Sequence, residues 1–218
     1  MGDNATTMTR LGIFGTSGFA REVDDIAFAL DLRTVFIARD AAERDAWARP
    51  GEVMLEADVG SGSGMQFAIG IGDPALRRKV AQRHGATLNF VNLIHPSATF
   101  GRGQRALLDR RRGVTVCAGV RFMNSIQIGD FTVFSLNATI GHDCIVDDFS
   151  TLAPGVNISG QVHIGIACWL GTGAAINQGT AQTQLSIGAG TVIGSGAVVI
   201  RDCAPGAVYA GVPAKRIP

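Results

Sequence analysis

Residues 116–176 read VCAGVRFMNSIQIGDFTVFSLNATIGHDCIVDDFSTLAPGVNISGQVHIGIACWLGTGAAI. In this stretch an aliphatic or aromatic residue returns at every sixth position, eleven times in one register: Val116, Phe122, Ile128, Phe134, Ile140, Val146, Leu152, Ile158, Ile164, Leu170 and Ile176. Neither the 3.6-residue period of a helix nor the 2-residue alternation of a strand gives this spacing, whereas a hexapeptide β-helix repeat does. The segment therefore predicts short strands wound around a prism, three blocks to a coil. Residues 18 apart would stack in neighbouring coils about 4.8 Å apart.

Two further positions of the six-residue block carry a pattern. The fifth position is small or β-branched, at Ala138, Cys144, Ser150, Val156, Val162, Cys168, Ala174 and Thr180. Glycine often follows the first position, at Gly129, Gly141, Gly165 and Gly171, where we expect a tight corner that excludes a Cβ atom. The register shifts once, by 11 residues from Ile176 to Ile187, and this step predicts a loop or a shortened corner.

The composition of the 218 residues excludes several classes of protein. Lys and Arg number 19 against 18 Asp and Glu, so no charge excess favours nucleic acid or a membrane surface as a partner. No apolar stretch approaches the length of a membrane span, and the polar first ten residues lack a secretory core, so we expect a cytoplasmic protein. The four cysteines have irregular spacing, which predicts neither a metal site nor a disulfide framework.

The first ninety residues have a different pattern, typical of a small α/β domain. Buried strands are predicted at 11–15, 34–38 and 66–71, with helices from near Phe19 and over 75–84. Strands that alternate with helices favour a parallel sheet. We therefore expect a Rossmann-like domain over residues 1–92 and the β-helix over residues 93–218.

The turn after the first predicted strand is the first candidate for ligand binding. It lacks the GxGxxG spacing, and a purely structural turn is about as frequent, but the exposed N–H groups of the following helix favour phosphate. Asp40 lies 22 residues after Gly18, near the position where such folds place a carboxylate against a ribose hydroxyl. The predicted substrate-binding residues are Gly15, Thr16, Ser17, Gly18, Asp40, Gly72 and Asp73.

With both halves placed, the chain resembles the bacterial nucleotide-sugar acyltransferases of the bacillosamine-pathway N-acetyltransferase and sialic-acid O-acetyltransferase type. The matching pieces span almost the whole chain: Gly15-Thr-Ser-Gly-Phe-Ala-Arg-Glu22, Ala68-Ile-Gly-Ile-Gly-Asp73 with Arg77, Leu93-Ile-His-Pro-Ser97, Ile140-Gly-His-Asp-Cys144 and Gly211-Val-Pro-Ala-Lys215. The resemblance implies a nucleotide-binding α/β domain followed by a left-handed parallel β-helix. It also implies a homotrimer in which acetyl-CoA lies between two subunits and the first domain holds a nucleotide-linked sugar.

The resemblance further implies roles for individual residues. The general-base histidine of the family falls on His142, with Asp143 beside it to orient the imidazole, and the backbone donor to the acetyl oxygen falls on Gly160. The implied CoA contacts are Gly160, Thr172, Gly173 and Lys215. Several members carry a second histidine near the thioester where this chain has Thr151; this departure leaves a second CoA contact open and the general base unaffected.

Other roles are conceivable for the histidines and for Cys144. Cys144 beside His142 could form a nucleophilic pair, but it occupies the small inward position of its block, which favours packing. His95 and His163 are out of coil phase with His142, which argues against a three-histidine metal site. The predicted activity is acetyl transfer from acetyl-CoA to the amino group, at C4, of a dideoxy amino sugar linked to UDP, GDP or dTDP. The alternatives are O-acetylation of a sugar hydroxyl and a non-catalytic nucleotide-sugar-binding trimer.

Overall fold

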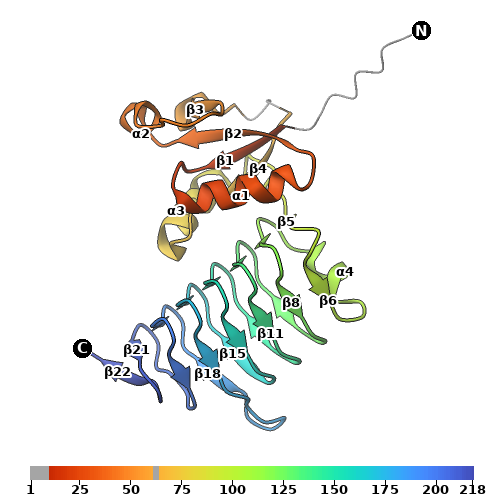
Figure 1. Ribbon diagram of the computed structural model, residues 1–218, viewed down its shortest axis with the longest axis vertical. Helices are drawn as coiled ribbons and strands as arrows, with labels where there is room; N and C mark the ends of the chain where they lie inside the picture. The colour runs from red at the N-terminus through yellow and green to blue at the C-terminus, as the bar shows by residue number, and fades with distance from the viewer. Residues whose placement is uncertain (1–9, 61–63) are drawn as a thin grey trace.

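The computed structural model describes residues 10–60 and 64–218, and it contains a small α/β unit set against a long stack of coils (Figure 1). The α/β unit has a four-stranded parallel sheet of order β3-β2-β1-β4. Its elements are β1 (Arg10–Phe14), α1 (Gly18–Phe28), β2 (Arg33–Ala38), α2 (Ala41–Asp45), β3 (Val53–Leu55), a 3-10 turn (Glu56–Asp58), β4 (Gln66–Ile69) and α3 (Pro74–His84). The Rossmann-like arrangement predicted for this part is confirmed.

The two long helices cover opposite faces of this sheet. Helix α1 packs through Val23 and Ile26 against Ile13. Helix α3 packs through Val80 against Ile37 on the other face. Because every strand is parallel, the carboxyl ends of β1, β2 and β4 lie at one edge, where open α/β sheets bind ligands.

The coils form a parallel β-helix with three sheets, as the six-residue period predicts. Residues 18 apart pair in parallel, for example Phe134 with Leu152 and Ile140 with Ile158. The first sheet contains β5 (Leu93–Ile94), β7 (Thr115–Val116), β10 (Val133–Phe134), β13 (Thr151–Leu152), β16 (Trp169–Leu170), β19 (Val192–Ile193), β21 (Val208–Ala210) and the antiparallel β22 (Lys215–Ile217). The second contains β6 (Thr99–Phe100), β8 (Arg121–Phe122), β11 (Thr139–Ile140), β14 (Asn157–Ile158), β17 (Ala175–Ile176) and β20 (Val198–Val199). The third contains β9 (Gln127–Ile128), β12 (Ile145–Val146), β15 (Val162–Ile164) and β18 (Leu185–Ile187).

Glycine acts at the corners in a different way from the one expected. The glycines after the first block position have ordinary φ angles, but a Cβ atom on Gly141 would lie 2.4 Å from the Ser159 carbonyl carbon in the next coil. The left-handed backbone occurs two residues later instead, at Asn137, Asp143 and Phe149 among others. Close approach of coils, and not corner geometry, therefore selects glycine there.

The register shift adds five residues to one coil. Ile164 pairs with Ile187, which is 23 residues later. Thr180, predicted to be an inward small residue, is exposed because the added segment begins before it. A second interruption, between β6 and β7, contains α4 (Gln104–Leu108), which the six-residue pattern did not predict.

One buried side chain joins the α/β unit to the coils. Arg77 of α3 is 1% exposed and donates to the Phe131 carbonyl at 2.8 Å and to Oγ1 of Thr151 at 2.8 Å. Beside it the aromatic rings of Phe131 and Phe149 stack 5.3 Å apart. The α/β unit therefore docks on the first sheet and its adjoining corner. The domain boundary expected at residue 92 stays a prediction. Among the described residues, no helix could cross a lipid bilayer.

Candidate active site

His142 and Asp143 form a hydrogen-bonded pair at the corner between β11 and β12. Nδ1 of His142 lies 2.7 Å from Oδ2 of Asp143, and each side chain is 44% exposed. Because a carboxylate accepts hydrogen bonds only, Nδ1 carries the proton, which leaves a lone pair on Nε2. The side chain is thus prepared to accept a proton through Nε2.

Gly160 lies directly against this imidazole, one coil further along. A Cβ atom on Gly160 would lie 2.5 Å from Nε2 of His142, so only glycine leaves room for the ring. Within residues 10–60 and 64–218, the amide N–H of Gly160 donates no hydrogen bond. The structure thus brings together the predicted base and a free backbone donor.

Two glutamine side chains hold Asp143, and the sequence reasoning did not identify them. Nε2 of Gln161 lies 3.2 Å from Oδ2 of Asp143, and Nε2 of Gln184 donates to the Asp143 carbonyl at 2.9 Å. Gln161 follows Asp143 by 18 residues, so coil phase was a signal for it. Gln184 lies at the end of the five-residue insertion, whose conformation the period does not specify.

A groove of about 490 Å³ runs past His142 and Gly160. Its other lining residues are Arg121, Met123, Thr139, Ile140, Gly141, Ile158, Ser159 and Gln178. Gln178 follows Gly160 by 18 residues and extends the same edge by one coil. The groove has an apolar floor and one cation, Arg121, which suits an extended ligand with an anionic portion.

The other histidine and cysteine candidates lie elsewhere. Cys144 is buried, and burial raises its pKa to about 11, so the neutral thiol cannot act as a nucleophile. His163 pairs with Asp147 at 2.9 Å on the third sheet, away from His142. In the described part of the chain, no three His, Cys, Asp or Glu residues are grouped to hold a metal ion.

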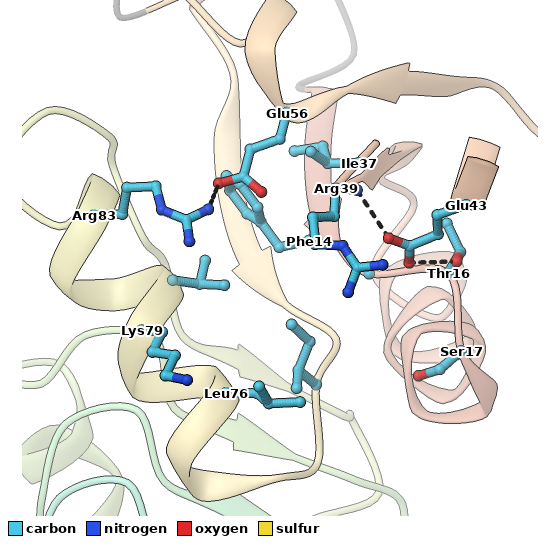
Figure 2. Close-up of a pocket in the computed structure, with 13 residues that line it drawn as sticks. Phe14, Thr16, Ser17, Ile37, Arg39, Glu43, Glu56, Leu76, Lys79 and Arg83 are labelled. Carbon is cyan, nitrogen blue, oxygen red and sulfur yellow. Dashed lines mark hydrogen bonds and ion pairs between the residues drawn. The ribbon is translucent and has the colours of Figure 1, made fainter. Parts of the chain in front are cut away.

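A second cavity, of about 350 Å³, lies at the carboxyl edge of the α/β sheet (Figure 2). Its walls come from the strand ends, the turn before α1, one face of α3, helix α2 through Glu43 and the 3-10 turn through Glu56. The lining residues are Phe14, Gly15, Thr16, Ser17, Ile37, Arg39, Glu43, Glu56, Ile71, Leu76, Lys79, Val80 and Arg83. Lys79 has no ion-pair partner among the described residues, so its charge is available to an anion.

The structure places the predicted substrate residues unevenly around this cavity. Gly15, Thr16 and Ser17 line it, whereas the remaining four do not: Gly18, Asp40, Gly72 and Asp73. The two aspartates cap helices, Asp40 by accepting from the Glu43 amide and Asp73 from the Leu76 amide. A ligand contact by any of these residues stays a prediction.

Glu43 takes the place on the cavity wall that was expected for Asp40. Its carboxylate accepts from the Thr16 hydroxyl at 2.6 Å and from the Arg39 amide at 2.9 Å. The spacing Asp40-x-x-Glu43 is that of a helix N-terminal capping motif. That signal could have assigned Asp40 to the helix start.

The cavity and the His142 groove lie on different sides of the coils. The α/β unit docks on the first sheet, through contacts such as Trp169 against Gly72 and Thr151 with Arg77. His142 lies at the corner between the second and third sheets. In a three-sided prism that corner is opposite the first sheet, so one chain does not bring its two candidate sites together.

Comparison with known proteins supports one family for both halves. Residues 10–84 match the PglD N-terminal domain. The chain is 29% identical over 154 residues to the GDP-perosamine N-acetyltransferase of Escherichia coli O157:H7, covering 69% of this chain and 67% of that protein. WeeI from Acinetobacter baumannii AYE superimposes with a TM-score of 0.85 at 25% identity, over 97% of this chain and 100% of that one.

A third relative carries both ligands. PerB from Caulobacter crescentus, solved with CoA and GDP-perosamine, has a TM-score of 0.83 at 27% identity, over 97% of this chain and 99% of that one. In both halves the chain matches nucleotide-sugar N-acetyltransferases.

Three predicted CoA contacts of this acetyltransferase lie away from the groove. Thr172 and Gly173 are exposed at the corner between the first and second sheets, across one sheet from Gly160. Lys215 is exposed in β22 at the end of the coils. Their contacts with CoA stay predictions that require a neighbouring subunit.

Thr151, where several family members were expected to carry histidine, has a structural role here. It is 3% exposed, accepts from Arg77 and donates to the Gly72 carbonyl at 2.8 Å. The residue therefore joins the two parts of the chain.

Proposed function

We propose that this acetyl-CoA-dependent sugar N-acetyltransferase transfers the acetyl group to the C4 amino group of a nucleotide-linked dideoxy amino sugar. The observation that carries the proposal is the stacking of Gly160 against the His142–Asp143 pair, which combines a base with an oxyanion donor. The Escherichia coli relative is a GDP-perosamine N-acetyltransferase, and PerB was solved with GDP-perosamine and CoA, which favours an amine over a hydroxyl acceptor.

The reaction needs one proton acceptor and one donor to an oxyanion. The substrate amine attacks the thioester carbonyl carbon, forming the C–N bond as its proton passes to Nε2 of His142. Asp143 holds the imidazole through Nδ1 and stabilises the imidazolium that forms. The Gly160 amide donates to the developing oxyanion. The tetrahedral intermediate then collapses, the C–S bond breaks, and the thiolate of CoA takes the proton from the imidazolium.

We further propose a homotrimer in which each site is shared. The α/β cavity of one subunit would face the His142 corner of the next, because these features lie on opposite sides of a single chain. Exposed apolar side chains support a covered edge: Met123 is 55% exposed and Ile200 is 42% exposed, both on the edge that contains His142. Burial of such a patch favours association.

The decisive test is a turnover assay with acetyl-CoA and a set of nucleotide-linked sugars that carry either a C4 amine or a C4 hydroxyl. The expected result is release of CoA with the amines, and a product heavier by one acetyl group whose amide is located by NMR. Turnover of the hydroxyl sugars alone would establish O-transfer instead. Sugar-nucleotide binding without any turnover would establish the non-catalytic assembly.

A further inference from the structure

A carboxylate and a guanidinium stand side by side at one end of the α/β cavity. Oε1 of Glu56 accepts hydrogen bonds from Nη1 of Arg83 and, at 2.7 Å, from Nε2 of His84. The side chains of Glu56 and His84 are only 12% and 17% exposed. Figure 2 shows Glu56 and Arg83 at the end of the cavity away from Ser17 and Leu76.

This carboxylate keeps one oxygen for a ligand. Oε2 of Glu56 accepts no hydrogen bond from residues 10–60 or 64–218. By contrast, both oxygens of Glu43 are occupied, by the Thr16 hydroxyl and the Arg39 amide. Among the carboxylates that line the cavity, Glu56 is therefore the one with a free acceptor.

The guanidinium beside it supplies a free donor. Arg83 uses Nη1 for Glu56 and is 55% exposed, and a guanidinium has five N–H groups in a planar fork. Oε2 of Glu56 is thus an acceptor beside the free N–H donors of Arg83. This pair matches a ligand edge that has an N–H next to a carbonyl oxygen. The lactam edges of uracil, thymine and guanine have this order, whereas adenine and cytosine present an unprotonated ring nitrogen in place of the N–H.

The neighbouring walls suit a flat ring. The aromatic ring of Phe14 and the aliphatic side chains of Ile37 and Val80 line the same cavity. Ser17, directly before α1, and the unpaired ammonium of Lys79 lie toward its other end, where a helix N-terminus and a cation would attract a diphosphate. The cavity thus offers an apolar slot between two ends: a polar end formed by Glu56 and Arg83, and a cationic end at Lys79.

We propose that Glu56 and Arg83 recognise the nucleobase, and that they select a lactam base over adenine and cytosine. The inference rests on the proposed function, since it places the nucleotide of the nucleotide-linked acceptor sugar in this cavity. A base without the ring N–H would leave Oε2 of Glu56 facing a lone pair. Buried polar groups that lose their partners in this way discriminate strongly between ligands.

The test is calorimetric binding of UDP, GDP, CDP and ADP to the full-length protein. We expect UDP and GDP to bind about 10- to 100-fold more tightly than CDP and ADP, the range for one well-placed base contact. Equal binding of all four diphosphates would overturn the inference and leave the proposed function intact. No binding of any diphosphate would overturn the proposed function as well.

Variants separate base recognition from general damage. Glu56→Gln is expected to weaken UDP and GDP by about 10-fold while CDP and ADP change little. Glu52→Gln is the matched control, because Glu52 pairs with Arg10 on the surface outside the cavity. CoA binding and the circular dichroism spectrum of each variant report whether the fold is intact. A well-folded Glu56→Gln protein that keeps its preference for UDP and GDP would overturn the inference.

Discussion

The hydroxyl of Thr151 lies 2.8 Å from a guanidinium nitrogen of Arg77, although the two residues belong to the two different halves of the chain. The same guanidinium donates to the carbonyl oxygens of Ile71, Gly72, Phe131, Phe149 and Ser150. No carboxylate accepts from it among the residues described, so its charge is distributed over backbone dipoles. Burial lowers the pKa of Arg77 to about 9, which still leaves it protonated at neutral pH.

Arg77→Met is expected to destabilise the protein by about 3 kcal/mol or more, because several buried carbonyl oxygens would lose their donor. Urea unfolding followed by circular dichroism measures the change. Arg78→Met is the control, since Arg78 is exposed on the same helix. An unfolding midpoint for Arg77→Met equal to that of the control would mean that the contacts of Arg77 contribute little to stability.

His142→Asn is expected to lower kcat by about 10²–10⁴ while the affinities for both substrates change little, as for removal of a general base. His163→Asn is the matched control, because His163 also pairs with an aspartate but lies on another sheet. Steady-state kinetics measure kcat for each variant, and calorimetric binding measures its affinities for the two substrates. Near-normal turnover by His142→Asn at neutral pH would require a different base.

Gly160→Ala is expected to reduce kcat by a similar factor, because the new Cβ atom would fall 2.5 Å from Nε2 of His142 and displace the ring. Gly206→Ala is the control, since Gly206 has positive φ but open space around its Cα. The control should lose a little stability and keep its activity. A fully active Gly160→Ala enzyme would show that the ring does not need its present position.

Lys79→Glu and His142→Asn should each inactivate the enzyme, and mixing the two after unfolding and reassembly should restore part of the activity. Lys79 lines the cavity and His142 lines the groove, so a shared site can be assembled from one intact half of each chain. Arg78→Glu, on the same helix but outside the cavity, should retain activity by itself. Absence of any recovery in the mixture would indicate that each chain uses its own two halves.

Glu56 should make the stability of the protein depend on acid pH. Burial raises the pKa of its carboxyl, but hydrogen bonds from His84 and Arg83 outweigh this, so the pKa in the folded protein lies below the usual 4.5. The stabilisation is then fully present above pH 4.5 and is lost as pH falls through the lower, folded value. Thermal melts of wild type and Glu56→Gln should differ at neutral pH and converge below pH 4.5.

Much of the fold could be predicted because the six-residue period fixes which side chains point inward and which residues stack. Gly160 follows His142 by 18 residues, so the same period accounts for its place against the imidazole in the next coil. It could not predict which face of the prism the α/β unit covers, because docking depends on side chains such as Arg77 that fall outside the repeat. The cavity wall was only partly predicted. Asp40 caps α2 by accepting from the Glu43 amide, and Glu43 lines the cavity where Asp40 was expected.

The separation of the cavity and the His142 corner on opposite sides of one chain has a consequence for inheritance and expression. Suppose that the site is shared between subunits as proposed, and that a cell makes intact chains together with chains damaged at both places. Each site then draws one half from each of two chains chosen at random. The yield of working sites then falls as the square of the intact fraction, and not in proportion to it. Damage confined to one place would give only a proportional loss, so gene dosage itself would report how the site is assembled.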